Sequence, residues 1–155
     1  MNAKKITINT IISTSIIVSV AVLGSIFVNI GINWFNTLQK PAQWIPNILI
    51  PIVWTIIYSA FGLINFFWIK NNSIPTKTIV LMLINGFLNI FWCLVFFALK
   101  LTFLGNIVII LNLIAGFLLL TEIFKINKLY AYILSIYPLW LSIATTLNLA
   151  LWILN

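Results

Sequence analysis

The sequence has almost no acidic residues and no histidine, arginine or aspartate. Its 155 residues include eight lysines, one glutamate and one cysteine. With no histidine and a single carboxylate, the chain lacks the side chains for a histidine-based metal site or a paired acid–base centre. The single cysteine, Cys93, excludes a disulfide framework within the chain. We therefore expect no bound metal, no covalently attached cofactor and no conventional catalytic constellation.

The few charged residues separate long apolar runs. Apolar residues make up 63% of the chain, and the lysines fall at its start or in short breaks between the runs. Because a helix crosses a bilayer with about 20 apolar residues, the sequence predicts an all-α integral membrane protein, with one domain over residues 1–155. We expect five transmembrane helices, with an ordered loop between the first two, at about residues 6–30, 46–69, 79–99, 101–124 and 129–154.

The positions of the lysines indicate the partner and the orientation. A net charge of +7 is typical of nucleic-acid binding in a soluble protein. Here the lysines are scattered singly at span ends, where they reach lipid headgroups, so we expect the bilayer and not a nucleic acid as partner. A cytoplasmic N-terminus places six lysines inside and two, Lys40 and Lys100, outside. By the positive-inside rule, we expect a multi-pass cell-membrane protein with its C-terminus outside.

Three predicted spans carry polar and aromatic residues at helical spacing. These stripes are Trp54 and Tyr58 on the second span, Asn85, Asn89 and Trp92 on the third, and Trp140, Ala144 and Asn148 on the fifth. Unpaired amides are costly in hydrocarbon, so the Asn side chains must face protein or a cavity. One interpretation is hydrogen bonding between helices. The other is a shared aromatic cavity that fits a flat, hydrophobic ligand.

The connection after the first span, about residues 31–45, holds two tryptophans. Trp34 and Trp44 flank a Lys40-Pro41 pair, and Pro46 follows. Tryptophan at a span edge commonly marks the membrane interface, whereas two tryptophans around a rigid proline favour an ordered cap over the bundle. Both interpretations remain open from the sequence.

Two other patterns predict packing contacts. Glu122 lies three residues before Lys125, a spacing that predicts an ion pair on one helix face. Small-residue faces permit a homodimer without requiring one. They comprise Ala21 and Ser25 on the first span, and Asn112 and Gly116 on the fourth.

Four stretches match, in order, the motifs of one known family. Trp34-Phe35-x-x-Leu38-x-Lys40-Pro41 resembles W-Y-x-x-L-x-K-P, and Val53-Trp54-Thr55-x-x-Tyr58-x-x-x-Gly62 resembles V-W-T-x-L-Y-x-x-x-G. Asn89-x-x-Trp92-x-x-x-Phe96-Phe97 resembles N-x-x-W-S-x-x-F-F, with Cys93 in place of the serine. Trp140-x-x-x-Ala144-Thr145-x-Leu147-Asn148 resembles W-x-x-x-A-T-x-L-N. The chain thus resembles the tryptophan-rich sensory protein/translocator protein (TspO/MBR) family, formerly called peripheral benzodiazepine receptors.

This resemblance implies five helices around an intramembrane pocket for porphyrins, such as protoporphyrin IX, and for benzodiazepine- or isoquinoline-carboxamide-type ligands. The expected function is a membrane receptor or sensor for tetrapyrroles, and the lysine-only basic composition is typical of a bacterial member. Two alternatives remain: light- and oxygen-dependent porphyrin degradation, with Trp54 and Trp140 as candidate oxidisable residues, and transport of porphyrin or lipid. The expected ligand-binding residues are Trp34, Trp44, Trp54, Tyr58, Asn85, Asn89, Trp92, Trp140, Ala144 and Asn148.

Overall fold

The computed structural model describes residues 3–42, 44–70 and 74–155, and every regular element in them is a helix. The elements are α1 (Ala3–Thr37), α2 (Leu49–Lys70), α3 (Thr76–Cys93), the π-helix η1 (Leu94–Ala98), α4 (Thr102–Ile126), α5 (Lys128–Leu134) and α6 (Ile136–Leu154). Counting α3 with η1 and α5 with α6, five segments of the described chain are long and apolar enough to cross a membrane. The predicted all-α membrane bundle is confirmed.

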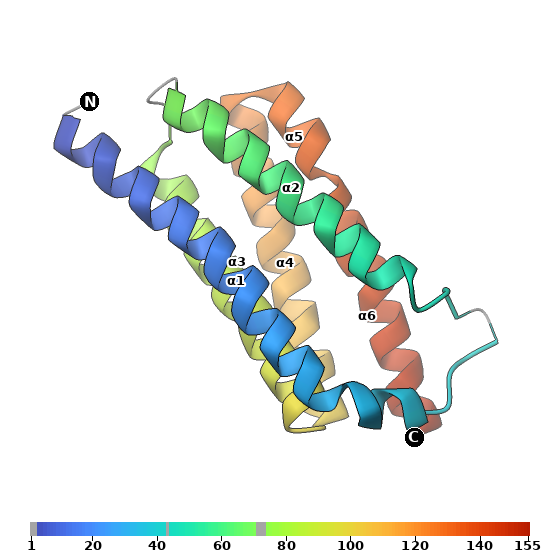
Figure 1. The fold of residues 1–155 in the computed structure, drawn as a ribbon. Helices are drawn as coiled ribbons and strands as arrows, with labels where there is room; N and C mark the ends of the chain where they lie inside the picture. Colours follow the sequence, from blue (N-terminus) through green and yellow to red (C-terminus); the bar gives the residue numbers. More distant parts are fainter. Residues whose placement is uncertain (1–2, 43, 71–73) are drawn as a thin grey trace.

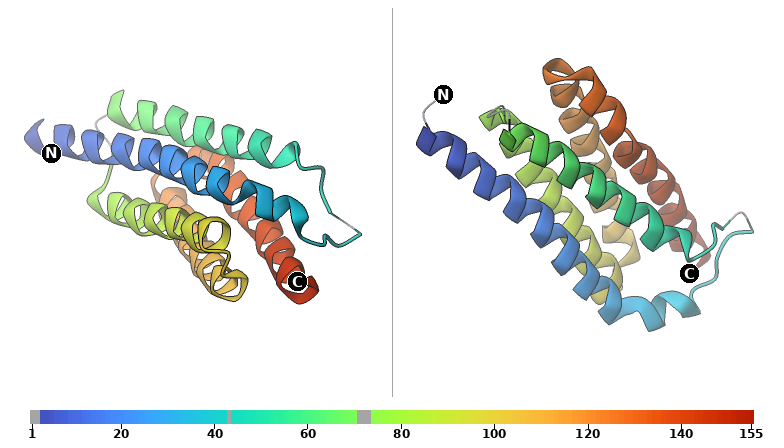
Figure 2. Two further views of the ribbon diagram at one scale, coloured as in Figure 1. Left: turned by 60° about the horizontal axis from the view of Figure 1, so that its bottom comes forward. Right: turned by 45° about the horizontal axis from the view of Figure 1, so that its top comes forward.

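The helices pack side by side in a closed order (Figure 1). Around the bundle, α1 contacts α3, α3 contacts α4, α4 contacts α6, and α2 contacts both α6 and α1. The two chain ends lie at opposite ends of the bundle, as an odd number of spans requires. Within the described residues α2 and α3 do not pack directly on each other. The left view of Figure 2 shows the reason, because α1 runs between them.

The first helix is longer than the predicted span. It continues to Thr37, so part of the predicted connection over residues 31–45 is helical, and Trp34 lies on a helix. The helix persists because the chain has no proline before Pro41. Its last turns are also held by packing, since Phe35 is buried in an aromatic cluster with Phe97 and other residues of α3 and η1.

The third span ends in a π-helical turn that the sequence did not indicate. The Leu99 N–H donates to the Leu94 carbonyl at 2.9 Å, and Lys100 then adopts a φ of 59°, which ends the helix. Adjacent residues of a regular α-helix point about 100° apart, so they rarely share one buried face. The wider turn instead buries three consecutive side chains, those of Val95, Phe96 and Phe97.

The fifth span is divided near Ser135 into α5 and α6. Pro138 has no N–H to donate to the carbonyl four residues earlier, so the regular ladder is interrupted there. The Leu139 N–H resumes the pattern by donating to the Ser135 carbonyl at 3.2 Å. The two pieces together still form a single apolar segment, Lys128–Leu154, long enough to cross the membrane.

The only carboxylate side chain pairs with two lysines near one end of the bundle. Glu122 accepts hydrogen bonds from Lys125 at 3.3 Å and from Lys77 at 2.7 Å. The predicted pair with Lys125 is confirmed, and the shorter bond to Lys77 joins α3 to α4. Both lysines are about two-thirds exposed, so these pairs contribute little to stability. The two ion pairs do neutralise the negative charge of Glu122.

Candidate functional site

A cavity of about 660 Å³ lies between α1, α2 and the α3–η1 segment. Because α2 and α3 do not pack directly, a space remains between them, lined by residues of these three segments and by Asn47 of the connection before α2. We call it the large cavity. All of its lining residues are uncharged types: Ala21, Gly24, Ser25, Val28, Asn29, Ile32, Phe35, Asn36, Asn47, Ile50, Pro51, Trp54, Thr55, Tyr58, Asn89, Trp92, Cys93 and Phe97.

The α2 and α3 walls of the large cavity present flat aromatic surfaces. Trp54 and Tyr58 are one helical turn apart on α2, and their rings stack with centroids 5.6 Å apart. On α3, Trp92 stacks in the same way on Phe96, with centroids 5.9 Å apart. Because these rings support one another within each wall, their faces and edges are held in place. The arrangement favours a planar, apolar ligand.

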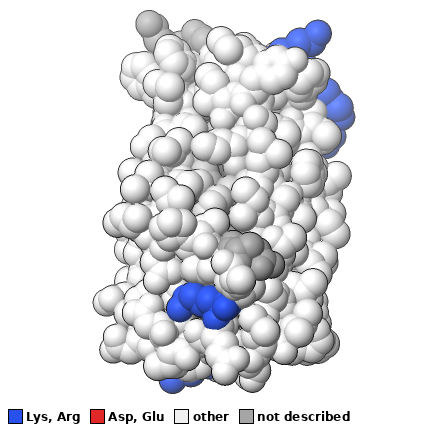
Figure 3. Space-filling model, turned by 90° about the vertical axis from the view of Figure 1, so that its right-hand side faces the viewer, with Lys and Arg blue, Asp and Glu red and all other residues white. Residues whose placement is uncertain are grey.

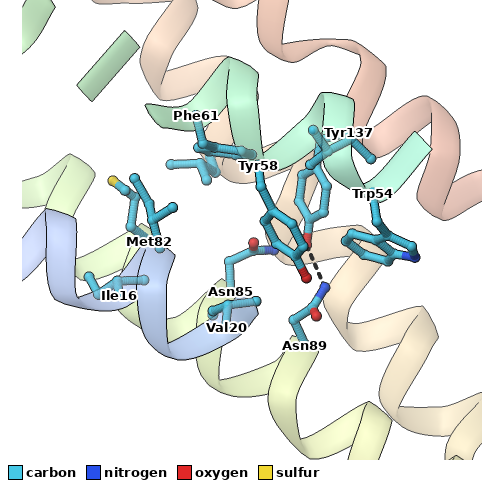
Figure 4. A pocket seen from close by; sticks show the side chains of 13 residues that line it. Ile16, Val20, Trp54, Tyr58, Phe61, Met82, Asn85, Asn89 and Tyr137 are labelled. Carbon is cyan, nitrogen blue, oxygen red and sulfur yellow. Dashed lines mark hydrogen bonds between the residues drawn. The ribbon is translucent and has the colours of Figure 1, made fainter. Parts of the chain in front are cut away.

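A second cavity of about 40 Å³, the small cavity, shares three wall residues with the large one. Trp54, Tyr58 and Asn89 line both, and Figure 4 shows them converging with Tyr137 and Asn85. The volume of the small cavity suits only a few water-sized groups. The three shared residues therefore form a partition at the inner side of the large cavity.

A network of amides and one phenol supports this partition. Asn112 Oδ1 on α4 accepts from Asn85 Nδ2 at 2.9 Å and from the Tyr137 hydroxyl at 3.3 Å. Asn89 Nδ2 in turn donates to the Tyr137 oxygen at 3.4 Å, the bond drawn in Figure 4. Within the described residues Asn89 Oδ1 has no hydrogen-bond partner, although the residue is only 2% exposed. The network thus leaves one buried acceptor on a residue that lines both cavities.

The same network corrects one expectation about assembly. Asn112 is fully buried, and Gly116 faces Leu141, Tyr137 and Asn85 within the protomer. The proposed dimer face on the fourth span is therefore occupied inside the bundle by α3 and α6. Ala21 and Ser25, the other small-residue face, line the large cavity.

Half of the predicted ligand-binding residues lie on cavity walls. Trp54, Tyr58, Asn85, Asn89 and Trp92 line one or both cavities. Trp34 and Trp44 line neither of these two cavities. The Trp34 ring packs edge-on against Phe96, and Trp44 packs against Phe35 while its Nε1 donates to Asn47 Oδ1 at 2.9 Å.

The three predicted residues of the fifth span also lie away from these two cavities. Trp140 is buried in a cluster with Ile57, Tyr137 and Leu141. Ala144 packs against the aromatic cluster that contains Trp92 and Phe96. Asn148 is only 4% exposed. The α6 stripe therefore packs inside the bundle beside the walls, and Tyr137 is the residue of α6 that reaches the small cavity.

The α1 wall was not among the predicted site residues. Val20, Gly24, Val28 and Ile32 repeat every four residues along α1 and face one or other cavity. This spacing indicates that the four residues share one helix face. Apolar residues at the same spacing are equally typical of a face that contacts lipid. Cys93 and Phe97 were also missed, although both occupy positions of the Asn89–Phe97 motif on the third span.

Comparison with known proteins agrees with this architecture. The TspO/MBR family model matches residues 13–153, nearly the whole chain. The chain belongs to the TspO/MBR family. It is 27% identical over 134 residues to the tryptophan-rich protein TspO of Bacillus cereus, covering 86% of this chain and 88% of that protein. It is 32% identical over 137 residues to the human translocator protein, covering 84% of this chain and 80% of that one. The resemblance inferred from the four motifs is confirmed.

Proposed function

We propose that this protein is a membrane receptor that binds tetrapyrroles such as protoporphyrin IX in the large cavity. The observation that carries the proposal is the cavity itself. Its volume of about 660 Å³ falls within the range of small-molecule sites, roughly 300–1,000 Å³. A tetrapyrrole is a flat, largely apolar ring, and stacked aromatic walls are the surfaces that complement it. Benzodiazepine- and isoquinoline-carboxamide-type ligands share those properties and would use the same walls.

The roles of the wall residues follow from their chemistry. Trp54, Tyr58 and Trp92 supply stacking area. The α1 wall, which is apolar except for Ser25, Asn29 and Asn36, covers the opposite side. Asn89 would orient a polar substituent of the ligand, since its side chain lines both cavities and its buried Oδ1 has no partner among the described residues. The family relationship adds independent support, because the motif residues Trp54, Tyr58, Asn89 and Trp92 all line the large cavity.

The test is a titration of the detergent-solubilised protein with protoporphyrin IX. We expect saturable quenching of tryptophan fluorescence and a shift of the porphyrin absorption band. Loss of one stacking partner should weaken binding about tenfold in Trp54→Leu. Trp152→Leu is the matched control, because Trp152 is 41% exposed on α6 and lines neither cavity. Equal affinities for the two variants, or no saturable signal in the wild type, would refute the proposal.

A second candidate function, light- and oxygen-dependent breakdown of the bound tetrapyrrole, is favoured by the position of Trp54. This indole lines both cavities, whereas Trp140 lines neither. If an indole beside the photoexcited ring is needed, Trp54→Phe should slow bleaching under illumination and Trp140→Phe should not. Equal bleaching rates at equal ligand occupancy in both variants and the wild type would remove the indole from the reaction.

A further inference from the structure

Lys40 lies beside the residues at one end of the large cavity. Phe35, Asn36 and Asn47 line this end of the cavity. The Lys40 ammonium lies 5.1 Å from the centre of the Phe35 ring and 5.9 Å from that of Trp44. Trp44 in turn is hydrogen-bonded to Asn47. Lys40 does not itself line the cavity, but its ammonium lies against Phe35, which does.

The backbone next to Lys40 is held in place by the other end of the chain. The Gln39 N–H donates to Asn155 Oδ1 at 2.9 Å, and Asn155 Nδ2 donates to the Gln39 carbonyl at 3.1 Å. Asn155 Nδ2 also bonds the Leu151 carbonyl on α6 at 2.9 Å. These hydrogen bonds hold the backbone next to Lys40 in place. The flexible four-carbon side chain of Lys40 still leaves its ammonium free to move.

The charge of Lys40 has no ion-pair partner within the described residues. Its contacts there are two ring faces and one carbonyl, that of Phe35 at 3.5 Å. An ammonium has three N–H donors, so two are free for another acceptor. Glu122, the only Asp or Glu in the chain, is already shared by Lys77 and Lys125. The face in Figure 3 shows the same scarcity of charge, with lysines near its two ends and no acidic residue.

We propose that Lys40 is the anion-binding residue of the large cavity and strengthens the binding of flat, apolar molecules that carry a carboxylate. The inference rests on the proposed function of this cavity and names the chemical class of its ligand. The apolar ring would lie between the aromatic walls, and its carboxylate would accept hydrogen bonds from the Lys40 ammonium. Near the membrane surface such a pair is partly desolvated, so it is screened less than a pair in bulk water.

The experiment compares protoporphyrin IX, which carries two carboxylates, with its uncharged dimethyl ester. Affinities of both are measured on the wild type, Lys40→Met and Lys40→Arg. We expect Lys40→Met to weaken the free acid about three- to tenfold and the ester less than about twofold. Lys40→Arg should keep the preference for the acid. Lys100→Met is the matched control, because it removes the other lysine at this end of the bundle and should leave both affinities unchanged.

The outcomes separate this inference from the proposed function. Equal weakening of acid and ester in Lys40→Met assigns the lysine a structural role and overturns the inference alone, as does no weakening of either. A wild type that binds neither compound overturns the proposed function as well. A second measurement needs no variant: in the wild type, the acid-to-ester affinity ratio should fall as salt is raised. A ratio independent of salt contradicts the ion pair even if Lys40→Met fails to fold.

Discussion

Replacement of Gly31 by alanine should loosen the contact between α1 and η1. A Cβ atom at Gly31 would lie 2.2 Å from the Phe97 carbonyl oxygen and 2.8 Å from the Phe97 Cα. Unstrained contacts of carbon atoms lie near 3.5–4.0 Å, so the two helices must separate by roughly 1 Å. The clashing atoms belong to backbone, which cannot rotate away as a side chain can. Overpacking of this kind typically costs about 1–3 kcal/mol.

An opposing effect enters the prediction for Gly31→Ala. Alanine is about 0.8–1.0 kcal/mol better than glycine within a helix, so we expect a net loss of about 0–2 kcal/mol in the free energy of unfolding. Phe97 also lines the large cavity, so moving α1 away from it should weaken ligand binding. Both quantities are measured on the detergent-solubilised protein, by unfolding in denaturant and by porphyrin titration.

Gly24→Ala is the matched control for this prediction. Gly24 lies on the same helix, but a Cβ there would meet only side-chain atoms, Cys93 Sγ at 3.5 Å and the Tyr58 hydroxyl at 3.9 Å. These are ordinary contact distances, so the helix-propensity gain should dominate and stability should hold or rise. If Gly31→Ala proves as stable as Gly24→Ala, the close approach of α1 to η1 is wrong.

Two further substitutions test the interior of the bundle. Asn112→Leu removes the acceptor shared by Asn85 and Tyr137, so two buried donors lose a partner and unfolding should become easier by about 1–3 kcal/mol. Tyr137→Phe removes the hydroxyl that donates to Asn112 and accepts from Asn89, so only one remaining donor, Asn89 Nδ2, loses its partner. It should cost less than Asn112→Leu, and the reverse order would contradict the network. Ala144→Thr adds two heavy atoms beside the aromatic cluster of Trp92 and Phe96, so the melting temperature should fall while affinity per folded molecule holds. A loss of affinity at unchanged melting temperature would instead place Ala144 in the ligand site.

The spans and two of the cavity walls could be predicted because each depends on one helix at a time. A run of about 20 apolar residues predicts a span by its length alone. The spacing of Trp54 and Tyr58, and of Asn85, Asn89 and Trp92, places each set on one helix face, and all five residues line a cavity. A polar or aromatic stripe within hydrocarbon must face protein, so its inward direction also follows from the sequence.

The choice of neighbour for each stripe could not be predicted, because it depends on the order of helices around the bundle. Trp140, Ala144 and Asn148 share a face as expected, but α6 packs that region against α4 and the aromatic clusters. Ser25, Asn29 and Asn36 lie at helical spacing on the α1 wall and are a polar signal of the cavity that the prediction missed. The π-turn of η1 was also missed, since Leu94–Ala98 is an ordinary apolar sequence whose register shift is set by packing.

The width of the large cavity depends on how α1 is attached to its two neighbours. Near one end, Asn65 Nδ2 on α2 donates to Thr14 Oγ1 on α1 at 3.0 Å. Near the other end, Gly31 lies against the Phe97 backbone of η1. Most of the α1 residues that line the cavity lie between these two points, so α1 acts as a spacer between α2 and α3. Substitutions at either attachment should therefore change ligand affinity without contacting the ligand, whereas changes on the lipid-facing side of α1 should not.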